Sequence, residues 1–188
     1  MRITGGAWRG RRVPELKGFK GRPTTDFGRE GLFNLMSSRV DFDGAHVLDL
    51  FAGTGMVSLE FLSRGAASVT AVEQTPKGCR FATSQASNLG SDDLHAVCAD
   101  VWGFLSKPLT QFDFVFADPP YDLPKLTDLP SAVRSSGILA AGGWFVLEHG
   151  ERVDLSQEEG HAGNNVFTRC RLACNPLRQR LQNSSLQR

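Results

Sequence analysis

The order of apolar and polar positions along the chain predicts an α/β protein. Short apolar runs that end at a glycine, a proline or an acidic residue predict buried strands over residues 47–51, 68–73, 95–99, 112–117 and 142–148. Apolar residues three or four positions apart predict helices between and before them, over residues 27–38, 56–63, 76–89 and 101–107, with a loop and helix over 124–136. Because strands and helices alternate, we expect a doubly wound, Rossmann-like sheet whose strands are mostly parallel.

The first predicted strand leads into a tight glycine loop. Residues 47–56 read VLDLFAGTGM, with a turn through Gly53 and Gly55 before the next helix. Glycine lets the backbone run close to a ligand, and a helix N-terminus presents unpaired N–H groups. The pattern lacks the third glycine of the dinucleotide fingerprint. It therefore predicts a loop that binds a carboxylate, a phosphate or a ribose.

Acidic residues follow the next three predicted strands. Glu73, Asp100 and Asp118 each stand where an apolar run ends. A single acid at such a point is usually a helix cap, but open α/β sheets bind ligands beyond the carboxyl ends of their strands. An acid at the end of the second strand, some twenty residues after a glycine loop, is where such folds hold ribose hydroxyls. The set predicts one binding crevice.

The sequence DPPY at residues 118–121 is the most informative short stretch. Two prolines fix φ and remove two N–H donors, so the chain leaves the strand rigid and extended. Asp118 and the carbonyl of Pro119 can accept hydrogen bonds from an amine, and the ring of Tyr121 can stack on a flat heterocycle. A strand terminator with an aromatic residue at its rim is the structural alternative.

Charge is distributed unevenly along a chain whose net charge is only +1. Residues 1–40 carry nine Lys or Arg against three acids, and residues 169–188 carry five Arg and no acid. The part between them has a net charge of −10. Basic ends on an acidic body indicate a polyanionic partner, although solvated basic termini would give the same pattern.

Residues 1–25 are interpreted as a basic, glycine-rich hairpin extension that faces RNA and forms no core. Basic side chains suit phosphates, and Trp8 suits stacking on a base. The candidate RNA-binding residues are Arg2, Trp8, Arg9, Arg11, Arg12 and Arg22. A hairpin folded against the domain is the alternative. Thr25 or Asp26 is expected to cap the following helix.

The C-terminal part gives a weaker signal. Residues 166–173 alternate as an edge strand does, and residues 175–188 have the composition of a disordered basic tail. The main domain is therefore expected over residues 26–174. The four cysteines lack metal-ligand spacing, and no apolar run is long enough to span a membrane. We expect a cytoplasmic protein with reduced thiols and no metal or membrane partner.

These motifs resemble those of a known enzyme family. The Asp49-x-Phe-x-Gly-x-Gly55 loop, Glu73, Asp100 and the DPPY stretch are similar to the motif series of class I S-adenosylmethionine-dependent methyltransferases that modify amines. With the N-terminal MRITGGAWRGRR and the RPTTD of residues 22–26, residues 1–150 resemble the bacterial 16S rRNA guanine-N2 methyltransferases. Phe27 and Gly28 depart from the basic or aliphatic pair that is usual after RPTTD.

The resemblance implies a fold, a cofactor and a set of roles. The fold would be that of class I methyltransferases, with one antiparallel strand near the C-terminus. S-adenosylmethionine would bind at Thr24, Asp49, Phe51, Gly53, Gly55, Glu73, Asp100, Val101 and Asp118. Asp118, Pro119 and Tyr121 would be the catalytic residues, holding the target amine. The partner would be 16S rRNA or the small ribosomal subunit, and the protein is expected to be a monomer.

Three alternatives remain at this point. A nicotinamide-dependent oxidoreductase would need a three-glycine loop and no double proline at the fourth strand, and the sequence contradicts both. A DNA adenine-N6 methyltransferase shares the DPPY type of motif. An RNA-binding ribosome assembly factor without catalysis would share the basic N-terminus.

Overall fold

A computed structural model describes residues 1–19, 24–107, 110–120, 122–150, 153 and 165–170. The helices are α1 (Asp26–Ser37), α2 (Met56–Ser63), α3 (Pro76–Leu89), α4 (Val101–Leu105) and α5 (Leu129–Ser135), with a 3₁₀ turn η1 (Leu126–Asp128) before α5. The strands are β1 (His46–Leu50), β2 (Ser68–Glu73), β3 (Leu94–Cys98), β4 (Phe112–Ala117), β5 (Leu139–His149) and β6 (Asn165–Cys170). Strands and helices alternate as the hydrophobic pattern predicts, which confirms the α/β class.

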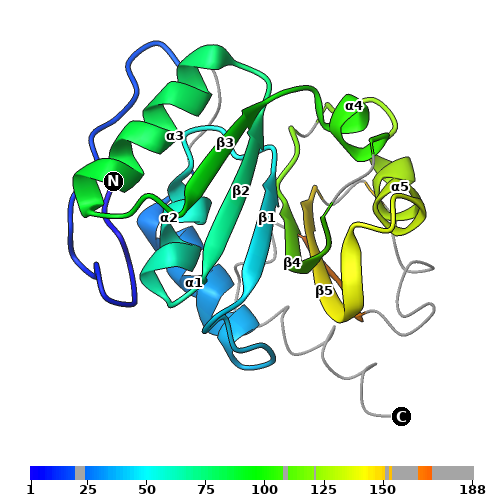
Figure 1. Ribbon diagram of the computed structural model, residues 1–188, viewed down its shortest axis with the longest axis horizontal. Coiled ribbons are helices and arrows are strands. Elements are labelled where there is room, and N and C mark those ends of the chain that lie inside the picture. The colour runs from blue at the N-terminus through cyan, green and yellow to red at the C-terminus, as the bar shows by residue number, and fades with distance from the viewer. Residues whose placement is uncertain (20–23, 108–109, 121, 151–152, 154–164, 171–188) are drawn as a thin grey trace.

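The strands form one sheet in the order β3-β2-β1-β4-β5-β6. The chain builds the sheet outward from β1 to β3, then returns to the other side of β1 with β4. This reversal of strand order lies between β1 and β4, where open α/β sheets form their binding crevice. Figure 1 shows the sheet in the middle, with α1, α2 and α3 on one side and α4 and α5 on the other.

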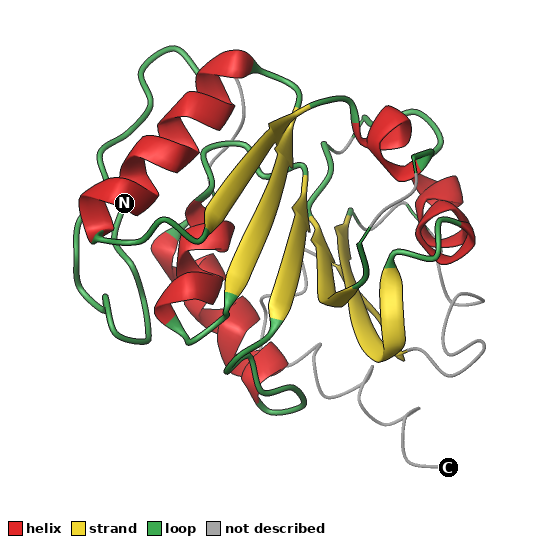
Figure 2. Ribbon diagram, viewed as in Figure 1, coloured by secondary structure: helices red, strands yellow, loops and turns green. Residues whose placement is uncertain are grey.

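Two apolar cores hold these layers together. Side chains alternate between the faces of each strand, so Val47 joins the core under α1–α3, while Leu48 and Leu50 join the core under α4 and α5. Phenylalanine rings fill the first core; Phe61 packs edge-on against Phe33 with 4.8 Å between ring centroids. Figure 2 shows the same layers as helices on both sides of a continuous sheet.

The expected antiparallel strand is wrong. Within the described ranges all five strand pairings are parallel, including that of β6 with β5. β6 does lie at the edge of the sheet. Alternation of apolar and polar residues identifies an edge strand but is the same for both directions, so the pattern could not show the direction. The proposed tail over residues 175–188 lies outside the described residues.

The N-terminal hairpin extension is not supported either. Residues 1–13 contain one isolated antiparallel bridge, between Arg2 and Arg12, and no strand. Ile3 and Val13 are almost completely buried in the core under α1–α3. This segment therefore contributes to the core of the domain, contrary to the expectation from its composition.

Candidate active site

The glycine loop after β1 has a backbone that few residues tolerate. Phe51, Gly53 and Gly55 all have positive φ, at 64°, 60° and 74°. A Cβ on Gly55 would lie 2.6 Å from the Cβ of Ala82 in α3, so glycine is required there. Phe51 has no such freedom, and a non-glycine residue in this region costs about 1–3 kcal/mol. Strain of this kind is typical of loops that hold ligands.

Asp49 is a buried carboxyl group beneath this loop. It is 1% exposed, and its Oδ2 accepts a hydrogen bond from the Ser58 hydroxyl of α2 at 2.5 Å. Burial, with the nearby charges of Asp118 and Glu73, raises the pKa of Asp49 from 3.8 to about 7, although the hydrogen bond from Ser58 acts to lower it. The three acids therefore lie close enough to influence one another. A cation placed among them would be stabilised.

Glu73, at the end of β2, holds the loop in place. Its Oε2 accepts from the backbone N–H of Gly53 at 3.0 Å, and its Oε1 accepts from the N–H and the hydroxyl of Thr75 at 2.8 and 2.6 Å. Each carboxylate oxygen has two lone pairs, so hydroxyl groups of a ligand can still be accepted. Gly78 in the first turn of α3 permits this arrangement, because a Cβ there would lie 2.7 Å from both Glu73 Cγ and the Gly53 carbonyl oxygen.

Asp100 and Val101 follow β3 at the same edge of the sheet. Asp100 is exposed and caps α4, since its Oδ1 accepts from the N–H of Gly103 at 3.0 Å. Val101 is 4% exposed within the core under α4 and α5. The structure thus gives both residues a structural role, and their contact with a cofactor stays a prediction.

Asp118 lies just beyond β4, on the far side of β1 from Glu73. The β1 register pairs Asp49 with Phe116 of β4 and with Ala71 of β2, so Asp118 and Glu73 each lie two residues further along. Thr24, which precedes α1, donates its hydroxyl to Asp118 Oδ2 at 3.4 Å. Two motifs 94 residues apart in sequence are thereby joined. Pro119 is buried beside Asp118, and Tyr121 and Arg22 lie outside the described residues.

The candidate RNA-binding residues of the N-terminal segment differ in what they contact. Arg9 and Arg12 are exposed, and Arg2 is exposed while bonding Asp26 at 3.4 Å. Arg11 instead donates to the carbonyl oxygens of Leu89 and Asn88 at 3.0 and 3.1 Å, where it satisfies the C-terminal end of α3. Trp8 is half-buried against the apolar core.

The sequence analysis missed a buried ionic network between α1 and α2. Arg29 is fully buried, pairs with Glu60 at 3.3 Å, and donates to the Thr24 carbonyl oxygen at 2.6 Å. Glu60 also accepts from the backbone and hydroxyl of Thr4 and pairs with Arg64. Two signals were present: Glu60 is the one charged residue in the buried helix α2, and Arg29 shares the apolar helical face of Leu32, Phe33 and Met36.

The two glycines near the N-terminus have a packing role. A Cβ on Gly6 would lie 1.7 Å from the Ser63 carbonyl oxygen, so only glycine lets this segment meet the end of α2. Ser63 then accepts from the N–H of Ala7 at 2.6 Å and donates its hydroxyl to the Gly5 carbonyl oxygen at 2.6 Å. A hairpin was predicted at these glycines, and the structure shows one isolated antiparallel bridge across the segment, between Arg2 and Arg12, without strands.

Phe19 was also missed. It lies over the glycine loop, with ring atoms 3.6 Å from the position of a Cβ on Gly53. Lys77 in the first turn of α3 donates to the Lys17 carbonyl oxygen at 2.5 Å, which holds this part of the N-terminal segment over the loop.

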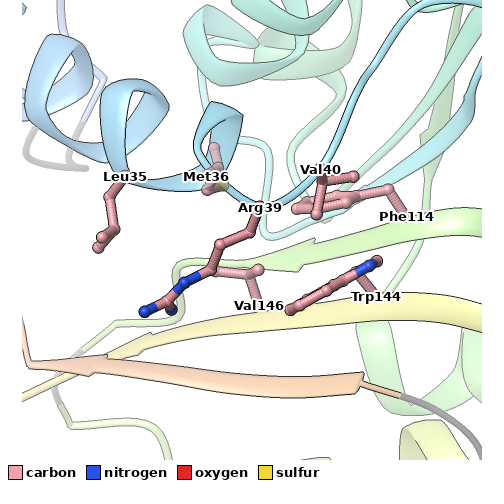
Figure 3. A pocket seen from close by; sticks show the side chains of 7 residues that line it. All are labelled: Leu35, Met36, Arg39, Val40, Phe114, Trp144 and Val146. Atoms are coloured by element: carbon pink, nitrogen blue, oxygen red, sulfur yellow. The ribbon is translucent and has the colours of Figure 1, made fainter. Parts of the chain in front are cut away.

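The structure also contains a hollow that lies apart from the strand ends. Figure 3 shows it between the C-terminal part of α1 and strands β4 and β5, with Met36 and Val40 across from Trp144 and Val146. Its β4 residue is Phe114, four positions before Asp118. Among the described residues no His, Cys, Asp or Glu cluster could hold a metal ion. No helix in the described ranges combines the length and the apolar character that a membrane span requires.

Comparison with known proteins places this chain in a family. The profile of the family described as Conserved hypothetical protein 95 matches residues 1–164. The putative rRNA methyltransferase YlbH of Bacillus subtilis is 32% identical over 181 residues, which cover 90% of this chain and 91% of the relative. The chain belongs to the family of ribosomal RNA small subunit methyltransferase D, a family of class I S-adenosylmethionine-dependent rRNA methyltransferases.

Other members support this placement. Ribosomal RNA small subunit methyltransferase D of Escherichia coli is 35% identical over 140 residues, which cover 74% of this chain and 70% of the relative. Among solved structures, a putative methyltransferase from Escherichia coli superposes with a TM-score of 0.67 at 33% identity, covering 75% of each chain. A hypothetical protein of Thermus thermophilus superposes with a TM-score of 0.70 at 30% identity, covering 82% of this chain and 89% of that one.

Proposed function

We propose that this protein transfers the methyl group of S-adenosylmethionine to the exocyclic N2 amine of a guanine in 16S ribosomal RNA. The observation that carries the proposal is the contact between Thr24 and Asp118, which joins the RPTTD and DPPY motifs beside the strained glycine loop. One relative named as a putative rRNA methyltransferase and another named as a methyltransferase of small-subunit rRNA support the reaction and the class of substrate.

The residues at the strand ends fit this cofactor. Gly53 and Gly55 give the loop its positive φ angles and its close packing on Phe19 and Ala82, and α2 begins directly after Gly55 with its N-terminus at the loop. The carboxylates of Asp49, Glu73 and Asp118 suit a ligand that carries a sulfonium and an ammonium charge. Glu73 would accept from the ribose hydroxyls, and Asp100 from the adenine amine. When bound, S-adenosylmethionine supplies an electrophilic methyl group.

Asp118 and the Pro119 carbonyl oxygen would hold the target amine. The nitrogen lone pair of a guanine amine is delocalised into the ring, which makes it a weak nucleophile. Hydrogen bonds accepted from its two N–H groups favour localisation of the lone pair, and in-line placement supplies much of the remaining rate. Thr24, through its hydroxyl on Asp118 Oδ2, fixes the direction of that carboxylate. In this proposal Tyr121 stacks on a base turned out of its RNA context.

The reaction is tested by offering three substrates separately. Purified protein is incubated with isotope-labelled S-adenosylmethionine and either free 16S rRNA, assembled small subunits or duplex DNA, and the nucleosides are identified by mass spectrometry. N2-methylguanosine in RNA is the expected product. N6-methyladenine in DNA, or RNA binding without methyl transfer, would instead identify a DNA methyltransferase or an assembly factor.

Asp118→Asn provides the matched variant for this assay. The amide keeps the size of the side chain but replaces one accepting oxygen with a donor, so the target amine loses an acceptor. We expect kcat to fall about 100-fold or more, the usual size of such an electrostatic effect, with a much smaller change in cofactor affinity. Full turnover in this variant contradicts the proposed role.

A further inference from the structure

One side chain at the rim of the candidate site is exposed without contributing to the fold. Phe27, in the first turn of α1, is 75% exposed and is the one large hydrophobic side chain in the described ranges that lies in solvent. Single exposed apolar residues are ordinary on protein surfaces. The neighbours of Phe27 are what make its position informative.

On one side, the first turn of α1 adjoins the candidate catalytic residues. A Cβ on Gly28 would contact the Thr24 methyl group at 3.3 Å, and the Thr24 hydroxyl reaches Asp118. Phe27 is three residues from Thr24, so the two Cα atoms are at most about 11 Å apart. Bases along a helical strand are spaced by about 3.4 Å. Phe27 thus lies within a few nucleotides of the position proposed for the target base.

On the other side, Asp26 borders a basic, open groove. The groove is lined by Met1, Arg2, Arg12 and Asp26, and both arginines are exposed. Its arginines provide the charge that a phosphate backbone requires. An exposed aromatic ring between a basic groove and an amine-binding corner is the arrangement with which proteins hold single-stranded nucleic acid.

We propose that Phe27 stacks on an unpaired base of the substrate RNA next to the target nucleotide, while Arg2 and Arg12 contact the phosphates that lead away from it. This inference rests on the proposed function for the identity of the polymer. It adds a residue that determines how the RNA is held.

The test uses four variants of the full chain with a 16S rRNA transcript as the probe. Phe27→Ala and Phe27→Leu remove the ring, Phe27→Trp keeps a ring, and Asn34→Ala is the control, since Asn34 is exposed on the same helix two turns further along. RNA affinity, KM for RNA, S-adenosylhomocysteine affinity and thermal stability are measured for each. Because the ring is exposed, all four variants should fold as the parent does.

We expect Phe27→Ala and Phe27→Leu to weaken RNA binding and raise KM for RNA roughly 5- to 100-fold, the range of base–aromatic stacking. Phe27→Trp and Asn34→Ala should stay within about threefold of the parent, and cofactor affinity should not change. Equal RNA affinity for Phe27→Ala and the parent would overturn the inference, as would retention of affinity by Phe27→Leu. A loss seen on assembled subunits and not on the naked transcript would also overturn it, because the ring would then meet a protein.

The RNA-binding measurement separates this inference from the proposed function. If the parent binds RNA and transfers no methyl group, the proposed reaction is wrong. The RNA affinities of the variants still test whether Phe27 contacts RNA. If the parent methylates RNA and the ring is without effect, the reaction stands and the inference is wrong.

Discussion

At the scale of single residues, the candidate site is a set of buried or strained groups that the fold alone does not require. Asp49 is a carboxyl group in the interior with a raised pKa, and Phe51 has a positive φ without being glycine. Each lowers the stability of the folded protein. Their position on one loop, beside Glu73 and Asp118, fits the proposed binding of a cationic ligand.

The raised pKa of Asp49 predicts how cofactor affinity depends on pH. Because the folded-state pKa of about 7 lies above the ordinary 3.8, this group's contribution to stability is present below pH 3.8 and is lost as the pH rises towards 7. A bound ammonium or sulfonium group favours the ionised carboxylate and releases its proton. The affinity for S-adenosylhomocysteine, whose ammonium provides that charge, should therefore increase as the pH rises from 6 to 8. Below the pKa of Asp49 the increase should reach up to about tenfold per pH unit.

Calorimetry at several pH values, in buffers of different ionisation enthalpy, measures both the affinity and the released proton. Asp49→Asn cannot ionise, so its affinity should be lower and nearly independent of pH over the same range. The same slope in Asp49→Asn as in the parent would assign the proton to another group.

At the scale of elements, three helices begin in the same way. Thr25, Thr75 and Asp100 are N-caps, and each accepts from the N–H of a glycine three residues later, namely Gly28, Gly78 and Gly103. Alanine is the better helix former by about 1 kcal/mol, so each glycine needs a separate reason. At Gly78 the reason is space, because an added Cβ would meet Glu73 and the Gly53 carbonyl oxygen. At Gly103 the nearest atom to an added Cβ would be Asp100 Oδ1, at 3.8 Å.

This contrast gives a prediction with a matched control. Gly78→Ala should displace Glu73 and the glycine loop, and thereby weaken S-adenosylhomocysteine binding about tenfold or more, as expected when a ligand-holding group loses its position. Gly103→Ala makes the same change at the same helix position and should leave cofactor affinity unchanged while the free energy of unfolding rises slightly. Equal effects of the two substitutions on binding would contradict the role assigned to Gly78.

The contact between α1 and α2 depends on a buried charge pair. In Arg29→Met, Glu60 loses one of its partners in a place without water, and removal of one partner of a buried pair costs about 3–5 kcal/mol. For a chain of this length we expect the melting temperature to fall by roughly 10 °C. Arg9→Met is the control, since Arg9 is exposed and such changes alter stability by about 0.5 kcal/mol or less. Urea unfolding curves that coincide for both variants would contradict a structural role for Arg29.

At the scale of the whole molecule, the features that the sequence predicted are those set by nearby residues. α2, α3, β2 and β4 have the predicted bounds because periodicity and capping act within a few positions. β5 begins earlier than predicted, since Leu139 already pairs with Phe112, and the register then shifts before Phe114 pairs with Trp144. The direction of β6 and the packing of Gly6 on Ser63 depend on partners far along the chain, which no local pattern contains.

The candidate site divides in the same way. Glu73, Asp100 and Asp118 were predicted because strand ends meet at one edge of a parallel sheet, whereas Asp49 was predicted from the family resemblance. The family resemblance alone placed Thr24 in the cofactor site, and its contact with Asp118 was not predicted. Arg11 shows the limit of reasoning from charge: it is exposed like Arg9 and Arg12, but its guanidinium bonds the end of α3, whereas the side chains of Arg9 and Arg12 make no hydrogen bond or ion pair within the described residues.

The division among these arginines leads to a prediction about salt. Exposed arginines that contact phosphates release counterions, so log K for single-stranded RNA falls with log salt by about 0.7 for each phosphate neutralised. Arg9→Gln with Arg12→Gln should weaken RNA binding at low salt and reduce that slope by about 1–2. Lys107→Gln with Lys125→Gln removes the same charge from exposed positions next to α4 and α5 and should leave the slope unchanged. Arg11→Gln should chiefly lower the free energy of unfolding, because the carbonyl oxygens at the end of α3 lose their donor. If both double variants changed the slope equally, the binding would reflect net charge, and the basic N-terminal segment would not be the surface that meets RNA.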